Sequence, residues 1–128
     1  MRNLQAVPMD WSHTWYIVGL ALMLVHEMDA MRCTEWRIFP GLSMLPDRIG
    51  RILFILLHIP LFLFLLAAIT APIPSRAFIT GLDIFLIVHM GLHLLFLLHP
   101  KNAFKDVWSW SIIAGAALCG ALDLFKGL

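Results

Sequence analysis

Long apolar runs separated by short polar segments are the main feature of this chain, and they predict four transmembrane helices. A helix needs about 20 mostly apolar residues to cross the hydrocarbon core of a bilayer. Residues 35–48 are too apolar for a free loop and too broken by proline and glycine for a span, so we expect them to lie along the membrane interface. The spans are expected at residues 14–32, 49–70, 77–98 and 107–125. The sequence therefore predicts an all-α integral membrane four-helix bundle, a single domain over residues 1–128.

The composition supports a membrane protein, with membrane lipids as its surroundings, and excludes several soluble classes. Hydrophobic residues make up 61% of the chain and charged residues only 13%, whereas soluble domains are typically about a quarter charged. Nine Lys/Arg stand against eight Asp/Glu, so there is no basic field to favour a nucleic acid partner. Cys33 and Cys119 lie in different apolar segments, which excludes a disulfide-rich scaffold and the spacing of a zinc ribbon.

The basic residues are unevenly distributed between the two sides of the predicted bundle. Six Lys/Arg fall between spans one and two or between spans three and four, and three fall on the opposite side. Because basic loops stay in the cytoplasm, this asymmetry predicts that both termini lie outside it. The two sets are Arg32, Arg37, Arg48, Arg51, Lys101 and Lys105 on the inner side, and Arg2, Arg76 and Lys126 on the outer side.

Span four carries small residues at a spacing of four, which places them on neighbouring positions of a helix face. The pairs are Gly115/Cys119, Ala116/Gly120 and Ala117/Ala121. Such faces let helix backbones approach closely in lipid. They fit packing within the four-helix bundle, and the alternative is a homodimer through this face of span four.

Four histidines fall near one level of the predicted bundle. His26, His58 and His93 each lie between five and nine residues from the cytoplasmic end of a span, which places them roughly 8–14 Å inside that boundary. His89 is one turn deeper and shares a helix face with His93, four residues on. Ionisable groups at membrane depth are costly and normally face a bundle interior, paired with one another. A polar network that holds the helices in register is one interpretation, and a convergent ligand cluster is the stronger one.

Carboxylates beside these histidines favour a metal site near the cytoplasmic side. The candidate metal ligands are His26, Asp29, His58, His89 and His93. Two histidines at a spacing of four, a third histidine and a carboxylate match zinc or non-haem iron in ligand type. Glu27 and Glu35 are the candidate catalytic groups, which would orient an imidazole or act as acid and base. At this depth a lipid could enter laterally, so the predicted chemistry is lipid-directed hydrolysis or oxidation.

Other functions remain open at this point. A b-type haem between His58 and His89 or His93 ranks below zinc and iron, because haem would not account for the carboxylates beside His26. A small proton-coupled transporter or channel would use the histidines and Asp29 as a relay. A metal-free lipid or sterol isomerase would use histidine and glutamate to move a proton. In an accessory membrane subunit, the histidines would only satisfy one another.

Three sequence blocks resemble an uncharacterised family of small bacterial membrane proteins, known only as a domain of unknown function. The blocks are His26-Glu27-Met28-Asp29-Ala30 with the following Glu35-Trp36-Arg37, the stretch His58-Ile59-Pro60-Leu61-Phe62, and the pair His89 and His93. More distantly, the first block is similar to the HXXEE family, with Asp29 where that motif has Glu. The resemblance implies a four-helix protein of the bacterial inner membrane and supplies no reaction.

Overall fold

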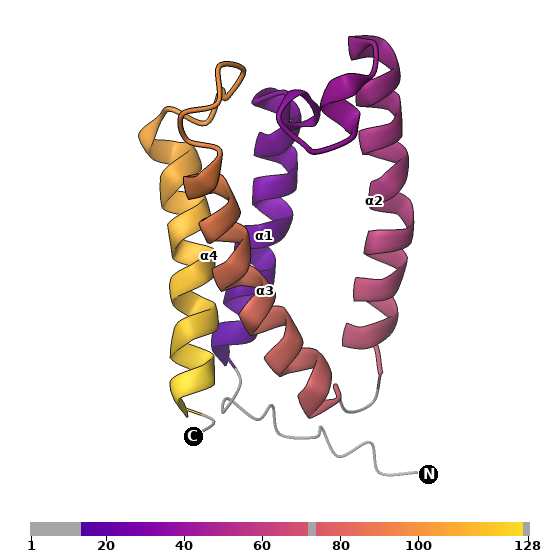
Figure 1. Cartoon of the computed structure of the whole chain (residues 1–128). Coiled ribbons are helices and arrows are strands. Elements are labelled where there is room, and N and C mark those ends of the chain that lie inside the picture. The colour runs from indigo at the N-terminus through magenta and orange to yellow at the C-terminus, as the bar shows by residue number, and fades with distance from the viewer. Residues whose placement is uncertain (1–13, 72–73, 127–128) are drawn as a thin grey trace, which may run out of the picture.

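The computed structural model describes residues 14–71 and 74–126, and this part of the chain forms four long helices (Figure 1). They are α1 (Thr14–Arg32), α2 (Asp47–Ile69), α3 (Arg76–Leu95) and α4 (Val107–Lys126). Two short 3-10 helices, η2 (Glu35–Arg37) and η3 (Leu42–Met44), lie between α1 and α2. The all-α prediction of four helices is confirmed. Arg2, which was counted with the outer basic residues, lies outside the described residues.

The third helix ends earlier than its apolar run suggests. The run extends to Leu98, but α3 ends at Leu95 and the chain continues in turns, in which His99 N–H donates to the carbonyl of Phe96. Pro100 follows, and a proline disfavours helical geometry in the residue before it. His99 therefore lies outside α3, away from the face that carries the other histidines of this helix.

Three of the described helices are long and apolar enough to cross a membrane, namely α2, α3 and α4. The first helix, α1, has a similar length, but its last two turns carry ionisable residues at positions 26, 27, 29 and 32. Most side chains of α2 point outwards, among them large apolar ones. Exposed apolar surface of this extent is typical of a lipid-facing helix. Examples on α2 are Ile55, Leu56, Leu57, Ile59, Leu63 and Phe64.

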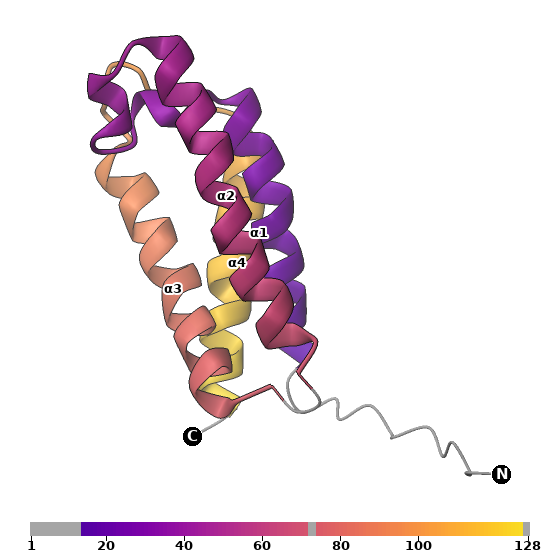
Figure 2. The same ribbon diagram turned by 90° about the vertical axis from the view of Figure 1, so that its right-hand side faces the viewer.

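Helices α1, α3 and α4 form a tightly packed unit, and α2 stands apart from it (Figure 1). The segment between α1 and α2 lies at the same end of the bundle as the loop between α3 and α4 (Figure 2). The small residues of α4 make this packing possible, since Ala116, Ala117, Cys119 and Gly120 are all buried. The α-carbon of Gly120 lies so close to α3 that an added Cβ would be 2.6 Å from the carbonyl oxygen of Asp83. The small-residue face is therefore used inside the chain. The homodimer expected through span four stays a prediction.

The segment between α1 and α2 is a packed element, which attaches α2 to the rest of the fold. Trp36 and Leu42 are buried with Phe54 of α2 in one apolar cluster. The indole N–H of Trp36 donates to Oδ1 of Asp47 at the start of α2, at 2.9 Å. Gly50 lets α2 pass close to the backbone of Leu42, since an added Cβ would be 3.0 Å from its carbonyl oxygen. Helix α2 is thus attached to the rest of the fold mainly near its first residue, next to residues 35–48, which were predicted to lie along the membrane interface.

We expect Gly120→Ala to destabilise the fold, because the added methyl group would meet the backbone of Asp83, which cannot move aside like a flexible side chain. Overpacking of this kind costs about 1–3 kcal/mol. Gly91→Ala on α3 is the matched control, since an added Cβ there has no neighbour within 4 Å among the described residues. Thermal unfolding in detergent, followed by circular dichroism, should show a lower Tm for Gly120→Ala alone. Equal Tm values for the two variants would contradict the close approach of α3 and α4.

Candidate metal centre

Three histidine side chains from α1 and α3 meet inside the bundle. His89 and His93 project from the same face of α3, one turn apart, and His26 faces them from α1. The Nε2 atom of His93 lies 3.1 Å from Nε2 of His89 and 3.3 Å from Nε2 of His26. The residues His26 and His93 are 1% and 4% exposed. Three imidazole nitrogens thus point toward one small, largely enclosed space.

A carboxylate joins the histidines from the segment that follows α1. Thr34 has a left-handed backbone conformation, with φ 52° and ψ 45°, and this turn directs the buried Glu35 back toward the bundle. The Glu35 carboxylate oxygens lie 3.8 Å from Nε2 of His26 and 3.6 Å from Nε2 of His93. Burial raises the pKa of Glu35 to about 8, with a further contribution from the negative charges of Glu27 and Asp29. A cation beside Glu35 would offset this cost of burying its charge.

The four donors have the spacing of metal ligands. Ligand atoms of His26, Glu35, His89 and His93 all lie within 4.8 Å of one another. Around a tetrahedral zinc ion with Zn–N bonds of about 2.0–2.1 Å, two ligand atoms are about 3.3 Å apart. The distances of 3.1–3.8 Å observed between pairs in this group bracket that value. This group could therefore hold a metal ion.

Phe104, in the loop between α3 and α4, forms an apolar wall of the group. Its ring stacks on His26 with centroids 5.5 Å apart and meets His93 edge-on at 4.5 Å. The backbone N–H of Phe104 donates to Oδ1 of Asn102, and its carbonyl accepts the indole N–H of Trp110. Phe104 was not among the residues predicted to form the site. The available signal was an asparagine two residues before a lone phenylalanine in a polar loop, which is typical of a side-chain-stabilised turn.

His26 lacks a hydrogen bond that metal-bound histidines usually make through their second ring nitrogen. Such a ring ordinarily donates its second N–H to an acceptor, which fixes its orientation. Nδ1 of His26 is buried and has no hydrogen-bond partner among residues 14–71 and 74–126. The ring is held instead by aromatic contacts, edge-on with His89 and His93 and stacked with Phe104.

His58, expected among the metal ligands, lies outside this group and pairs with Glu27. Its Nε2 atom is 2.5 Å from Oε2 of Glu27, and its Nδ1 atom is 2.6 Å from the carbonyl oxygen of Phe54. Both ring nitrogens therefore already have partners, which leaves neither for a metal ion or a haem iron. The structure thus brings Glu27 and His58 together, but as a pair separate from the four donors.

Asp29, the other expected ligand, also points elsewhere. Its Oδ1 atom accepts a hydrogen bond from Nε of Arg32 at 2.7 Å, and its Oδ2 atom accepts one from the hydroxyl of Ser109 at 2.5 Å. Arg32 also donates to Asp106, the residue before α4. Asp29 thus belongs to a network that joins the ends of α1 and α4. Glu35, expected as a catalytic group, takes the place of Asp29 beside the histidines.

An apolar cavity of about 390 Å³ leads to the group from the side of η2 and α3. Glu35, His89 and His93 line its inner part. The remaining lining is apolar, and it includes Leu92 and Leu95, which are 46% and 73% exposed. The four donors are therefore adjacent to a space that an apolar molecule could occupy. The other lining residues are Ile38, Phe39, Pro40 and Phe96.

The chain belongs to a family of unknown function (DUF6713), whose model matches residues 12–128. The match includes all three blocks on which the resemblance to a domain of unknown function was based. No curated protein and no solved structure matches the chain.

We expect Asp29→Asn to lower stability more than Asp106→Asn, although both residues accept from Arg32. The side chain of Asp29 is 10% exposed and that of Asp106 is 41% exposed, so water compensates less for the charge lost at Asp29. The expected cost at Asp29 is about 1–2 kcal/mol. At Asp106 it is smaller, because Asp106 caps α4 by accepting from the backbone N–H of Ser109, and asparagine caps helices as well as aspartate. Chemical unfolding in detergent measures both. Equal losses would contradict the network as described.

Proposed function

We propose that this chain is an integral membrane metalloprotein that binds zinc or non-haem iron and acts on a membrane lipid. The observation that carries the proposal is the meeting of three Nε2 atoms and one carboxylate from three separate segments within 4.8 Å. The proposed ligands are His26, Glu35, His89 and His93. This set replaces the set expected from the sequence, because Asp29 and His58 have other partners.

Hydrogen bonding alone accounts poorly for this arrangement. An imidazole nitrogen offers either one proton or one lone pair. Nε2 of His93 lies within 3.3 Å of two other Nε2 atoms, so it can form only one full hydrogen bond at a time. A metal ion would accept the lone pairs of all three nitrogens together. The buried Glu35 would then carry negative charge next to a cation, which favours its charged form.

The ligand set and its surroundings suit chemistry on an apolar substrate. Either ion supplies a Lewis acid that polarises a substrate oxygen, and iron adds redox chemistry. The cavity beside Glu35 and His93 leaves room for a substrate next to the donors. Glu27, one residue from His26, is the candidate acid or base near the site. Lipid-directed hydrolysis or oxidation, as proposed from the sequence, remains the reaction class that these residues support.

The apolar side chains on the outside of the helices support a membrane location for this chemistry. Helices α2, α3 and α4 are long and apolar enough to cross a bilayer, and we propose that α1 crosses with them, shielded by α3 and α4. The basic residues of the two loops at the metal end support an orientation with that end in the cytoplasm and the termini outside it. The proposed location is the bacterial inner membrane, with the metal site in its cytoplasmic leaflet.

We expect purified protein to contain about one equivalent of zinc or iron per chain, and His89→Ala and His93→Ala to lose it, because each removes one of the donors. His58→Ala should keep the metal, since neither ring nitrogen of His58 faces the site. His99→Ala, outside α3, is a second control. Elemental analysis together with a visible absorption spectrum distinguishes zinc, non-haem iron and haem in one sample.

Two results would overturn the metal proposal. One is metal-free wild-type protein that is fully folded and does not bind added zinc or ferrous iron. The other is loss of metal in His58→Ala with retention in His89→Ala, which would return the site to the histidines expected from the sequence. Circular dichroism of every variant separates loss of metal from loss of fold.

We expect the metal end of the bundle to face the cytoplasm, which cysteine labelling can test. Lys101→Cys and Arg76→Cys place exposed thiols at opposite ends of α3, and the native Cys33 and Cys119 are buried. A membrane-impermeant maleimide should label Arg76→Cys in intact spheroplasts, and Lys101→Cys only after the membrane is permeabilised. The reverse pattern would contradict the orientation that the basic loops predict.

A further inference from the structure

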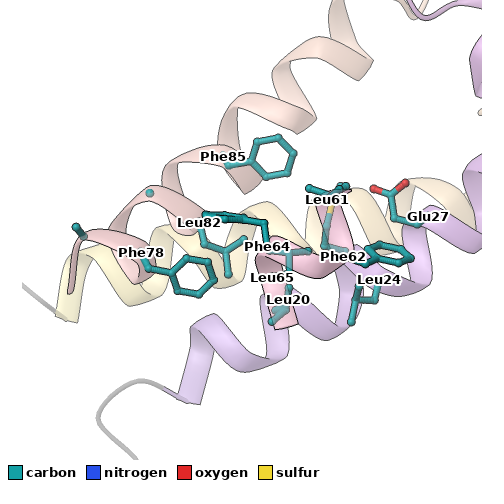
Figure 3. Close-up of a pocket in the computed structure, with 13 residues that line it drawn as sticks. Leu20, Leu24, Glu27, Leu61, Phe62, Phe64, Leu65, Phe78, Leu82 and Phe85 are labelled. Carbon is teal, nitrogen blue, oxygen red and sulfur yellow. The ribbon is translucent and has the colours of Figure 1, made fainter. Parts of the chain in front are cut away.

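A second apolar cavity lies between α1, α2 and α3, where α2 stands away from the other helices (Figure 3). Its volume is about 300 Å³, and leucine, phenylalanine and methionine side chains form most of its lining. The lining residues of α3 extend from Ala77 to Phe85, which is about 12 Å along the helix axis. The cavity is thus an elongated apolar space that runs beside α3 and away from the metal end.

Two of the aromatic residues that line the cavity are exposed, so α2 and α3 do not seal this space. Phe64 of α2 and Phe85 of α3 both line the cavity and are 62% and 43% exposed. In a bilayer, the surrounding medium at this point is hydrocarbon, so a lipid chain can enter between the two helices.

Among the residues that the structure describes, Glu27 is the single charged one that lines the cavity, and it lies at one end of it (Figure 3). Its partner His58 must donate through Nδ1, because the carbonyl oxygen of Phe54 can only accept. One proton then lies between Nε2 of His58 and Oε2 of Glu27. Whichever of the two atoms carries that proton, the pair as a whole is neutral, and the second oxygen of Glu27 can accept a further hydrogen bond.

We propose that this cavity binds the hydrocarbon chain of a membrane lipid whose polar end is an uncharged hydroxyl group held by Glu27. A neutral pair in an apolar surrounding can bind a hydroxyl group, whereas an ionised head group would bring an unpaired charge. The polar end would lie near the metal site, because Phe85 in the lining is only 5.5 Å from the ring of His89. The proposal rests on the membrane location in the proposed function, and it deepens that function by naming the substrate class.

Two glycines of α3 provide a matched test of the cavity. An added Cβ at Gly81 or at Gly91 has no neighbour within 4 Å among the described residues, so both positions accept a side chain. Gly81 lines the cavity, and Gly91 is exposed on the same helix. Gly81→Leu would therefore occupy the space of the lipid chain, whereas Gly91→Leu would not.

The experiment uses a photoreactive diazirine analogue of hexadecanol, added to the protein in phosphatidylcholine vesicles. We expect saturable labelling of residues 61–65 and 78–85 that excess unlabelled hexadecanol suppresses. Gly81→Leu should lower the competed labelling about tenfold, because its side chain displaces buried methylene groups of the ligand. Gly91→Leu should label like the wild type. Equal competed labelling in the two variants, or labelling that does not saturate, overturns the cavity as the binding site.

A separate competition experiment tests whether Glu27 holds the hydroxyl group of the lipid. In the wild type, hexadecanol should compete about tenfold better than hexadecane, since a hydrogen bond to a carboxylate holds its hydroxyl group. Glu27→Gln should bring the two competitors closer together while the cavity is still labelled. If hexadecane competes as well as hexadecanol with the wild type, Glu27 does not hold the polar end, and the proposal in this form fails.

Metal analysis of the same samples separates this proposal from the metalloprotein proposal. Gly81→Leu should keep its metal and lose the competed labelling, whereas His89→Ala should lose its metal and keep the labelling. Wild-type protein that is labelled but binds no metal would contradict the metal site alone. Wild-type protein that binds metal but shows no saturable labelling would contradict the lipid cavity alone.

Discussion

The arrangement of this protein depends on the cost of burying ionisable side chains in an apolar bundle, which requires each of them to find a partner there. Helix α1 carries four ionisable side chains in its last two turns, at positions 26, 27, 29 and 32. Successive residues of a helix are about 100° apart, so His26, Glu27 and Asp29 point in three directions. His26 meets α3, Glu27 meets α2 and Asp29 meets α4. The first helix therefore makes a polar contact with each of the other three.

The bundle combines tight and loose packing, and each type contributes a different part of the site. Small residues on α4 let α1 and α3 approach it closely, as the contact of Gly120 with the backbone of Asp83 shows. This rigid unit holds His26, His89 and His93 in place. Helix α2 instead contacts mainly η2 and η3, and the Glu27–His58 pair is its polar link to α1. The loose attachment of α2 leaves the cavity that the lipid proposal requires.

The sequence predicted the helices and the level of the polar residues well, and the choice of partners less well. Apolar run lengths determine the spans, and the spacing of His89 and His93 determines a shared face, so both are local properties. Partner choice is not local. His58 lies at the expected level along the bundle. Its position on the face of α2, however, directs its side chain to Glu27 and not to the other histidines. Asp29 likewise accepts a hydrogen bond from Ser109 instead of facing the histidines. This hydrogen bond depends on how α4 packs against α1.

Glu35 shows why a short non-helical segment can decide the chemistry of a helical site. Three neutral imidazoles provide lone pairs but no negative charge to balance a divalent cation. Glu35 would supply that charge to a bound cation only because Thr34 turns the chain back, in a left-handed conformation that costs a β-branched residue roughly 1–2 kcal/mol. The same turn buries Trp36 beside α2, which compensates for the strain by adding apolar contacts. The turn at Thr34 therefore couples the attachment of α2 to the fourth donor of the proposed metal site.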